Sequence, residues 1–178
     1  MTSPIILETE RLILRKYCQS DLQDLYEYLS DPEAIQFEPY KPMTVNEVQE
    51  NLAWRIRTDE MTAIELKSTK KMIGNIYLGK RDFDTLEIGY IINWNYWGHG
   101  YATESCKSLI RQAFECGIHR IYAECDPMNT SSCRLLERLG FRKEAHFLQN
   151  VYFWKGKNDM PVWKDTYVYA MLQGEELP

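Results

Sequence analysis

The middle of this chain contains an apolar run, a turn with two glycines, an amphipathic stretch and a second strand-like run, in that order. The apolar run covers residues 88–92, the turn reads Gly98-His99-Gly100, and apolar residues at helical spacing follow from residue 103. The second strand-like run covers residues 120–125. Two strands joined through a helix lie parallel in their sheet, because a tight hairpin joins only antiparallel strands. We therefore expect a β-α-β crossover over residues 85–125.

Periodicity and capping signals predict the elements on either side of this crossover. A first strand is expected from Ile6 to Lys16, and helices are expected after two capping boxes, Ser20-Asp21-Leu22-Gln23 and Thr44-Val45-Asn46-Glu47. The first of these helices should end at Asp31-Pro32. Further strands are predicted at 61–67, 71–81, 141–154 and 162–172, and a helix at 130–139 that Gly140 caps.

Composition limits the classes of protein to which the chain can belong. Its 178 residues fit one domain over 1–178, and an apolar content of 44% favours a packed core over disorder. A formal net charge of −5 argues against a nucleic-acid surface. Short apolar runs predict neither a membrane span nor a signal peptide, and five cysteines without a CxxC pair predict free thiols in the cytoplasm. The oligomeric state stays open, and a homodimer is compatible with the sequence.

The glycine turn has several interpretations. Glycines between a strand and a helix let a phosphate group approach the unpaired N–H groups at the helix start. A P-loop is excluded, because it requires Gly-Lys-Ser/Thr where this chain has Gly100-Tyr101-Ala102. A dinucleotide fingerprint requires a third glycine at Thr103, although Glu124 lies at the distance of the ribose-binding acid. The remaining alternative is a turn whose glycines serve only its backbone geometry.

Two motifs resemble signatures of the GNAT (Gcn5-related N-acetyltransferase) superfamily. Trp97-x-x-Gly100-x-Ala102 is similar to its pyrophosphate loop Q/R-x-x-G-x-G/A, and Asn129-x-x-Ser132 with residues 135–141 is similar to its next signature. Residues 9–15, 98–104 and 165–172 resemble the branch typified by RimJ and RimL, the ribosomal-protein N-terminal acetyltransferases. The resemblance implies an α/β (α+β) fold with a mixed, mostly antiparallel sheet of about seven strands, four helices and a splayed central parallel pair. Trp97 departs from the pattern and should remove a side-chain donor while leaving the backbone cradle intact.

The same resemblance implies a binding mode for acetyl-CoA. Backbone groups of Tyr90, Ile91 and Ile92 would pair with the pantetheine arm, and a backbone N–H of that strand would meet the developing oxyanion. The pyrophosphate would lie on the turn and helix start formed by Gly98, His99, Gly100, Tyr101, Ala102 and Thr103. Asn129 would contact the cofactor and also cap its helix. An acidic protein can bind this polyanion because the N–H donors and the helix dipole act locally.

Direct acetyl transfer to an amine requires a neutral amine, a polarised thioester and a proton for the leaving thiolate. Glu124 and Glu87 are candidate bases, although each is equally well explained as a strand-edge or surface carboxylate. The resemblance implies that Ser132 donates to the CoA thiolate; the alternative is that its hydroxyl satisfies a backbone N–H at the helix start. Three histidines without ligand spacing predict no metal site.

The acceptor is the least defined part of the expected reaction. A protein N-terminal α-amine and a small-molecule amine are both compatible with the resemblance. The acceptor pocket is expected between the first two helices and segment 147–163, with aromatic walls from Tyr26, Phe37, Tyr40, Tyr152, Phe153, Trp154 and Trp163. The alternative function is a non-catalytic acyl-CoA-binding sensor or scaffold.

Overall fold

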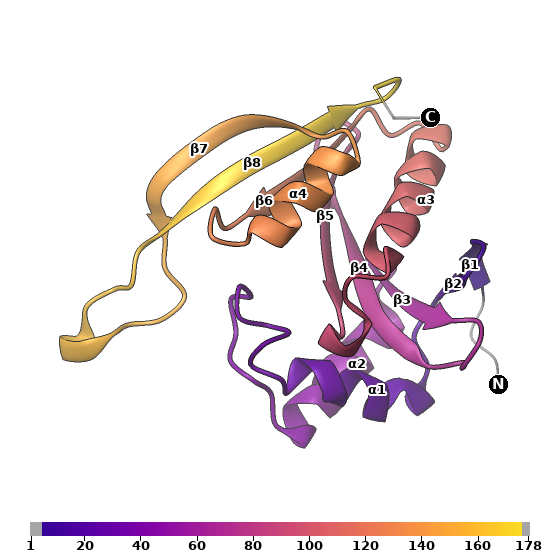
Figure 1. Cartoon of the computed structure of the whole chain (residues 1–178), viewed down its shortest axis with the longest axis horizontal. Coiled ribbons are helices and arrows are strands. Elements are labelled where there is room, and N and C mark those ends of the chain that lie inside the picture. Colours follow the sequence, from indigo (N-terminus) through magenta and orange to yellow (C-terminus); the bar gives the residue numbers. More distant parts are fainter. Residues whose placement is uncertain (1–4, 176–178) are drawn as a thin grey trace.

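The computed structural model describes residues 5–175, which form one eight-stranded sheet with helices on both faces (Figure 1). The strands are β1 (Ile5–Glu8), β2 (Leu12–Arg15), β3 (Met61–Leu66), β4 (Met72–Arg81), β5 (Thr85–Ile92), β6 (Arg120–Cys125), β7 (Arg142–Val151) and β8 (Lys164–Leu172). The helices are α1 (Leu22–Leu29), α2 (Val45–Arg57), α3 (Tyr101–Glu115) and α4 (Thr130–Arg138). The expected α+β architecture is confirmed, with eight strands where about seven were predicted.

The sheet order is β1-β2-β3-β4-β5-β6-β8-β7, and only β5 and β6 run parallel. Their pairing stops after Glu87 and Tyr122, the last of three residue pairs. Beyond that point, residues 88–92 of β5 pair only with β4, while β6 pairs with β8. Figure 1 shows the two halves of the sheet diverging from this point. The predicted crossover is confirmed, and it leaves an unpaired strand edge inside the sheet.

Successive residues of β5 contribute to two hydrophobic cores, because neighbouring side chains on a strand point to opposite faces. Ile88 and Ile92 belong to the cluster that contains Leu109 of α3. Ile91 belongs to the cluster that contains Leu25 of α1. The helices α3 and α4 therefore cover one face of the sheet, and α1 and α2 cover the other.

The predicted single strand from Ile6 to Lys16 is wrong, because a turn divides it into β1 and β2. Thr9 closes this turn: its amide donates to the Leu12 carbonyl at 3.0 Å, and the Leu12 amide donates to Thr9 Oγ1 at 3.0 Å. The two strands then pair antiparallel. The turn residues Thr9-Glu10-Arg11 include neither glycine nor proline, so the sequence has no local turn signal there.

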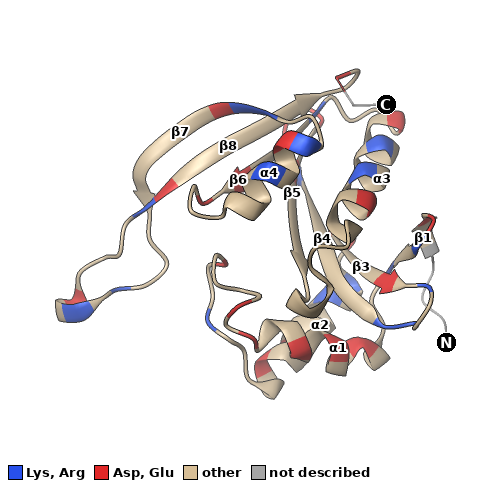
Figure 2. Cartoon of the chain, in the orientation of Figure 1, with Lys and Arg blue, Asp and Glu red and all other residues tan. Residues whose placement is uncertain are grey.

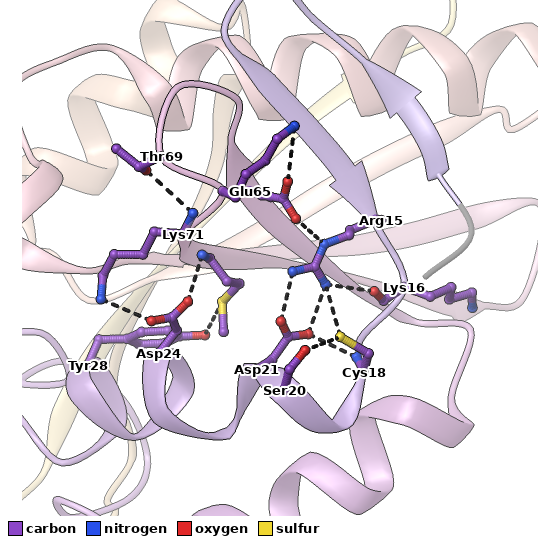
Figure 3. A network of polar contacts seen from close by, with 12 residues as sticks. Arg15, Lys16, Cys18, Ser20, Asp21, Asp24, Tyr28, Glu65, Thr69 and Lys71 are labelled. Carbon is purple, nitrogen blue, oxygen red and sulfur yellow. Dashed lines mark hydrogen bonds and ion pairs between the residues drawn. The ribbon is translucent and has the colours of Figure 1, made fainter. Parts of the chain in front are cut away.

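The capping box predicted at Ser20–Gln23 is also wrong, because Asp21 is the N-cap of α1 and the Ser20 hydroxyl contacts Cys18 Sγ at 3.0 Å instead (Figure 3). The Asp21 carboxylate has partners outside the helix. It accepts from Arg15 Nη1 at 2.8 Å, from Arg15 Nη2 at 2.7 Å and from the Cys18 amide at 2.9 Å. Arg15 also donates to Glu65 Oε2 at 2.6 Å. Arg15 and Asp21 are both buried, so the pair joins β2 to the start of α1.

Other predicted elements are confirmed. Thr44 and Glu47 form the second capping box, with the Thr44 amide donating to Glu47 Oε2 at 2.7 Å. Gly140 has a left-handed φ of 95° after α4. None of the helices between residues 5 and 175 is long and apolar enough to cross a membrane. The strands β7 and β8 form a long ribbon that extends beyond the rest of the sheet (Figure 1), with β7 as the outer edge.

Candidate active site

The glycine turn places the start of α3 next to the end of β5. Gly98 and Gly100 have φ values of 78° and 79°, a left-handed conformation that residues with a Cβ rarely adopt. Gly100 is the N-cap of α3, so the helix begins immediately after it. The first N–H groups of an α-helix have no partner within the helix and lie at the positive end of its dipole. The turn therefore presents N–H donors to an anion, as the sequence predicted.

The turn between β1 and β2 holds this helix start in place. Arg11 Nη1 donates to the His99 carbonyl at 2.9 Å, and Arg11 Nη2 lies 2.6 Å from Glu104 Oε2. The guanidinium also lies 4.6 Å from the centre of the Tyr101 ring. These contacts connect the Thr9-Glu10-Arg11 segment to the glycine turn, which gives this segment a structural role.

Trp97 keeps a side-chain donor, contrary to the expectation that a donor is lost there. Its indole Nε1–H donates to the Ile92 carbonyl at 2.7 Å. The bond ties the turn to the last residue of β5 and occupies a carbonyl that would otherwise be free. Ile92 is one of the three β5 residues predicted to pair with pantetheine, and its carbonyl already accepts this bond from Trp97.

A cavity of about 520 Å³ lies between α4, the start of α3, the end of β5 and the loop that joins α1 to α2. Its lining includes ten of the predicted cofactor and catalytic residues: Tyr90, Ile91, Ile92, Gly98, Gly100, Tyr101, Ala102, Thr103, Asn129 and Ser132. His99 is not part of the lining. Its ring is exposed, contacts the Trp97 carbonyl at 2.8 Å through Nδ1 and stacks on Tyr101.

The cavity has charged residues of opposite sign on its two sides. Arg134 and Arg138 of α4 line the part next to α3, where Arg138 Nη1 donates to Thr103 Oγ1 at 3.3 Å. Glu33 and Glu38 line it from the loop between α1 and α2. Figure 2 shows acidic positions along this loop and basic positions on α4. None of these four residues was predicted from the sequence. A signal for the two arginines was present, because they follow the Asn129 motif four positions apart and so lie on one face of the helix.

Asn129 and Ser132 have different roles at the start of α4. Asn129 is the N-cap, and its Oδ1 accepts from the Ser132 amide at 3.1 Å. The Ser132 carbonyl accepts from the Tyr90 hydroxyl at 3.3 Å, and burial raises the pKa of this phenol. The capping function therefore belongs to Asn129, and the Ser132 side chain hydrogen-bonds with the Tyr90 phenol.

The structure places Glu87 and Glu124 near the point where β5 and β6 separate, outside the lining of the cavity. The Glu87 carboxylate forms an ion pair with Arg81 and accepts from the Tyr122 hydroxyl at 3.3 Å. The Glu124 side chain reaches the surface, but partial desolvation and then the charge of Glu87 raise its pKa. A raised pKa favours Glu124 as a proton acceptor.

The aromatic residues expected around the acceptor pocket lie in two groups. Phe37 lines the cavity, while Tyr152 and Trp163 pack edge to face on the β7–β8 ribbon with ring centres 5.1 Å apart. The Lys164 ammonium connects the groups, because it lies 5.8 Å from the Phe37 ring and 5.7 Å from the Trp154 ring. The part of the chain that the structure describes contains no cluster of side chains suited to a metal ion.

Comparisons with known proteins agree with this arrangement. A family model described as an acetyltransferase (GNAT) domain matches residues 11–142. The uncharacterized N-acetyltransferase YnaD of Bacillus subtilis is 31% identical over 175 residues, covering 95% of this chain and 98% of YnaD. The crystal structure of a GNAT-family acetyltransferase from Bacillus anthracis superposes with a TM-score of 0.86 at 30% identity, covering 95% of this chain and 99% of that one.

A second structure is similar in fold alone. RimL, a ribosomal L7/L12 α-N-protein acetyltransferase solved in complex with coenzyme A, has a TM-score of 0.80 at 20% identity. The match covers 95% of this chain and 98% of RimL. Related proteins of this fold therefore bind CoA, as the resemblance implied.

Proposed function

The chain belongs to the acetyltransferase (GNAT) family of N-acetyltransferases, and from that premise we propose that it transfers the acetyl group of acetyl-CoA to a primary amine by direct attack. The observation that carries this proposal is the cavity, because residues from three separate motifs line it together: the end of β5, the glycine turn and the Asn129-x-x-Ser132 start of α4. The acidic loop on its far side suits a cationic amine.

The residues present fit CoA. The N–H groups that follow Gly98 and Gly100 suit the pyrophosphate, and the unpaired edge of β5 at Tyr90 suits the amides of the pantetheine arm. We add Arg134 and Arg138 to the predicted phosphate contacts, because their guanidinium groups line the same end of the cavity. Bound acetyl-CoA supplies the acetyl group as an activated thioester.

In this proposal the chain's own groups orient the reactants and move protons. A β5 backbone N–H stabilises the negative charge that develops on the acetyl oxygen. The Ser132 hydroxyl, on the residue that lines the cavity at the start of α4, donates to the leaving sulfur. The sequence favours Glu124, acting directly or through water, as the proton acceptor, with Glu87 second. Glu87 forms an ion pair with Arg81, whereas Glu124 has no ion pair among the described residues.

The proposed acceptor is an N-terminal α-amine or a small-molecule amine. The proposed location is the cytoplasm, because Cys125 and Cys133 lie 3.6 Å apart as free thiols. Titration with CoA in a calorimeter, followed by thiol release from acetyl-CoA across a panel of primary amines, tests the proposal. We expect CoA binding and thiol release that depends on one class of amine. CoA binding without release for any amine would favour the sensor or scaffold function instead.

A further inference from the structure

We infer that the Glu38 carboxylate, in the loop between α1 and α2, binds the ammonium form of the acceptor and takes its proton. This inference rests on the proposed acetyl transfer and names the residue that selects the acceptor. Glu38 lines the same cavity as Ile92 and Ser132, whereas Glu87 and Glu124 do not. A carboxylate inside the cavity needs no relay to reach an amine that approaches the end of β5.

The loop holds Glu38 in a fixed position. The Glu38 amide donates to the Ile35 carbonyl at 2.8 Å, and Ile35 is buried in the core formed with α1 and α2. Tyr40, on the other side of Glu38, packs against the same core. The loop is therefore anchored on both sides of the residue, so the carboxylate is held at the cavity wall rather than on a free surface segment.

Buried groups surround the carboxylate and set its protonation. Loss of solvent raises the pKa of Glu38 to about 7, and the Tyr40 hydroxyl and the Arg55 guanidinium offset part of that rise. Arg55 of α2 is 4% exposed, and its Nη1 donates to Tyr17 Oη at 3.0 Å. Between residues 5 and 175 no carboxylate lies within ion-pair distance of Arg55.

The buried phenols around this site do not compete with Glu38 for the proton at neutral pH. Burial raises the pKa of the Tyr17 phenol and of the Tyr28 phenol of α1, so both stay neutral. Burial raises the pKa of the Tyr40 phenol in the same way. The carboxylate of Glu38, with a pKa of about 7, is therefore able to exchange a proton with an amine at neutral pH.

The chemistry favours a weakly basic amine. An α-ammonium group has a pKa of about 8, close to that of Glu38, whereas a lysine-like ammonium has a pKa of about 10.4 and gives up its proton far less readily. One ammonium proton moves to a Glu38 oxygen, and the nitrogen lone pair forms the bond to the acetyl carbon. The carbon–sulfur bond breaks, a second nitrogen proton ends on the sulfur as the thiol, and Glu38 releases its proton to solvent.

The first test uses binding and titration, without turnover. Glu38→Gln is compared with wild type and with Glu50→Gln, which removes an exposed carboxylate from α2 outside the cavity. CoA affinity by calorimetry should be equal in all three proteins. In ¹³C NMR of glutamate-labelled protein, a carboxyl resonance that titrates near pH 7 should be present in wild type and Glu50→Gln and absent in Glu38→Gln.

Trialaninamide, which has a free α-amine, then serves as the acceptor probe on the CoA complex. It should shift the Glu38 titration to lower pH and bind at least tenfold more weakly to Glu38→Gln, while N-acetyl-trialaninamide should not distinguish the proteins. The inference is overturned if no glutamate titrates near pH 7, if trialaninamide leaves that titration unchanged, or if Glu38→Gln binds the probe as wild type does.

Kinetics separate this inference from the proposed function. With trialaninamide and acetyl-CoA at pH 7, Glu38→Gln should lower kcat/KM about 100-fold, within the usual range for a lost proton acceptor. The deficit should shrink above pH 9, where the amine is already neutral. If Glu38→Gln releases thiol with a wild-type pH profile, the proposed acetyl transfer stands and Glu38 is not its proton acceptor. Binding of the probe at Glu38 without thiol release would keep Glu38 as the amine site and refute the transfer.

Discussion

Arg11 and Glu104, 93 positions apart in the sequence, form an ion pair of 2.6 Å between the β1–β2 turn and the first turn of α3. The Glu104 carboxylate also accepts from Thr9 Oγ1 at 2.6 Å and from the Arg11 amide at 2.9 Å. Three bonds from one turn therefore fix the position of the helix start that carries the proposed phosphate site. The geometry of that site therefore depends on the glycines and also on a segment near the other end of the chain.

The Glu104 anchor should make stability depend on pH in the acidic range. Desolvation raises the pKa of Glu104, but the bonds from Thr9 and Arg11 outweigh it and hold the pKa below 4.5. Because the folded-state pKa is the lower one, this stabilisation is present above about pH 4.5 and disappears as pH falls through the folded value. At pH 7, Glu104→Gln should lower the free energy of unfolding by about 1–3 kcal/mol.

Urea unfolding at pH 7 and at pH 3 measures this effect. The difference between wild type and Glu104→Gln should shrink at the lower pH. Glu115→Gln, at the exposed end of α3, is the matched control and should differ little from wild type at either pH. A constant difference across this range would assign the loss to packing rather than to the charge.

Gly100→Val should abolish CoA binding. The residue has a φ of 79°, and a branched side chain there would strain the helix start and reach into the phosphate path. Gly117→Val is the control, because Gly117 has a similar φ of 92° with open space around it and lies at the opposite end of α3. Both variants should lose stability through backbone strain, but calorimetry should find that only Gly100→Val loses affinity for CoA. Equal affinities in the two variants would remove the turn from the site.

Arg138→Ala should weaken CoA binding about tenfold, as expected for the loss of one exposed contact to a phosphate. The dependence of affinity on salt concentration should become less steep, since one charged contact is missing. Arg111→Ala, on the exposed face of α3, is the matched control and should bind CoA as wild type does. If the two alanine variants behave alike, α4 takes no part in binding the phosphates.

Ser132→Ala should lower kcat by about 100-fold, the low end for a lost proton donor, because a thiolate is already a good leaving group. Stability should change by less than about 1 kcal/mol, because Asn129 rather than Ser132 supplies the cap. Ser108→Ala, which removes a hydroxyl bonded to the Glu104 carbonyl on α3, controls for the loss of a helical serine. Wild-type turnover in Ser132→Ala would require a different donor to the sulfur.

Glu124→Gln and Glu87→Gln distinguish the base favoured by the sequence from the one inferred from the cavity. With Glu38 as proton acceptor, both variants should retain kcat within about tenfold of wild type and keep the acidic limb of the pH–rate profile. A fall of about 100-fold in Glu124→Gln, with a flattened acidic limb, would return the role to Glu124. Rate profiles from pH 5 to pH 9 on one amine acceptor make the comparison.

Much of the sheet could be predicted from the sequence because its signals are local. Strand alternation, the two glycines before α3 and the Thr44–Glu47 capping box each act within a few residues, and the structure confirms all of them. The errors at Thr9 and Asp21 have a different origin. There, side chains bond to residues that the local pattern does not indicate: Asp21 to Arg15 of β2, and Thr9 to Glu104 of α3.

The residues of the candidate site show the same difference between local signals and long-range contacts. The cofactor residues lie in contiguous motifs, so the sequence could place them. Glu38 lies in a loop with no motif of its own, and only packing of Ile35 into the core brings it to the cavity opposite α4. Arg134 and Arg138 were missed because a charged helix face is usually solvated, and nothing local shows that α3 begins beside it.

The separation of β5 from β6 also has a consequence for the lifetime of the protein. Residues 88–92 form an open strand edge within the sheet, and an open edge is a site for unwanted pairing with other chains. A ligand that lies along this edge covers it and binds only the folded state. At a concentration 100 times its Kd, such a ligand adds about 2.7 kcal/mol to the free energy of unfolding. With the proposed binding of CoA along this edge, resistance to proteolysis and aggregation should therefore rise with CoA concentration.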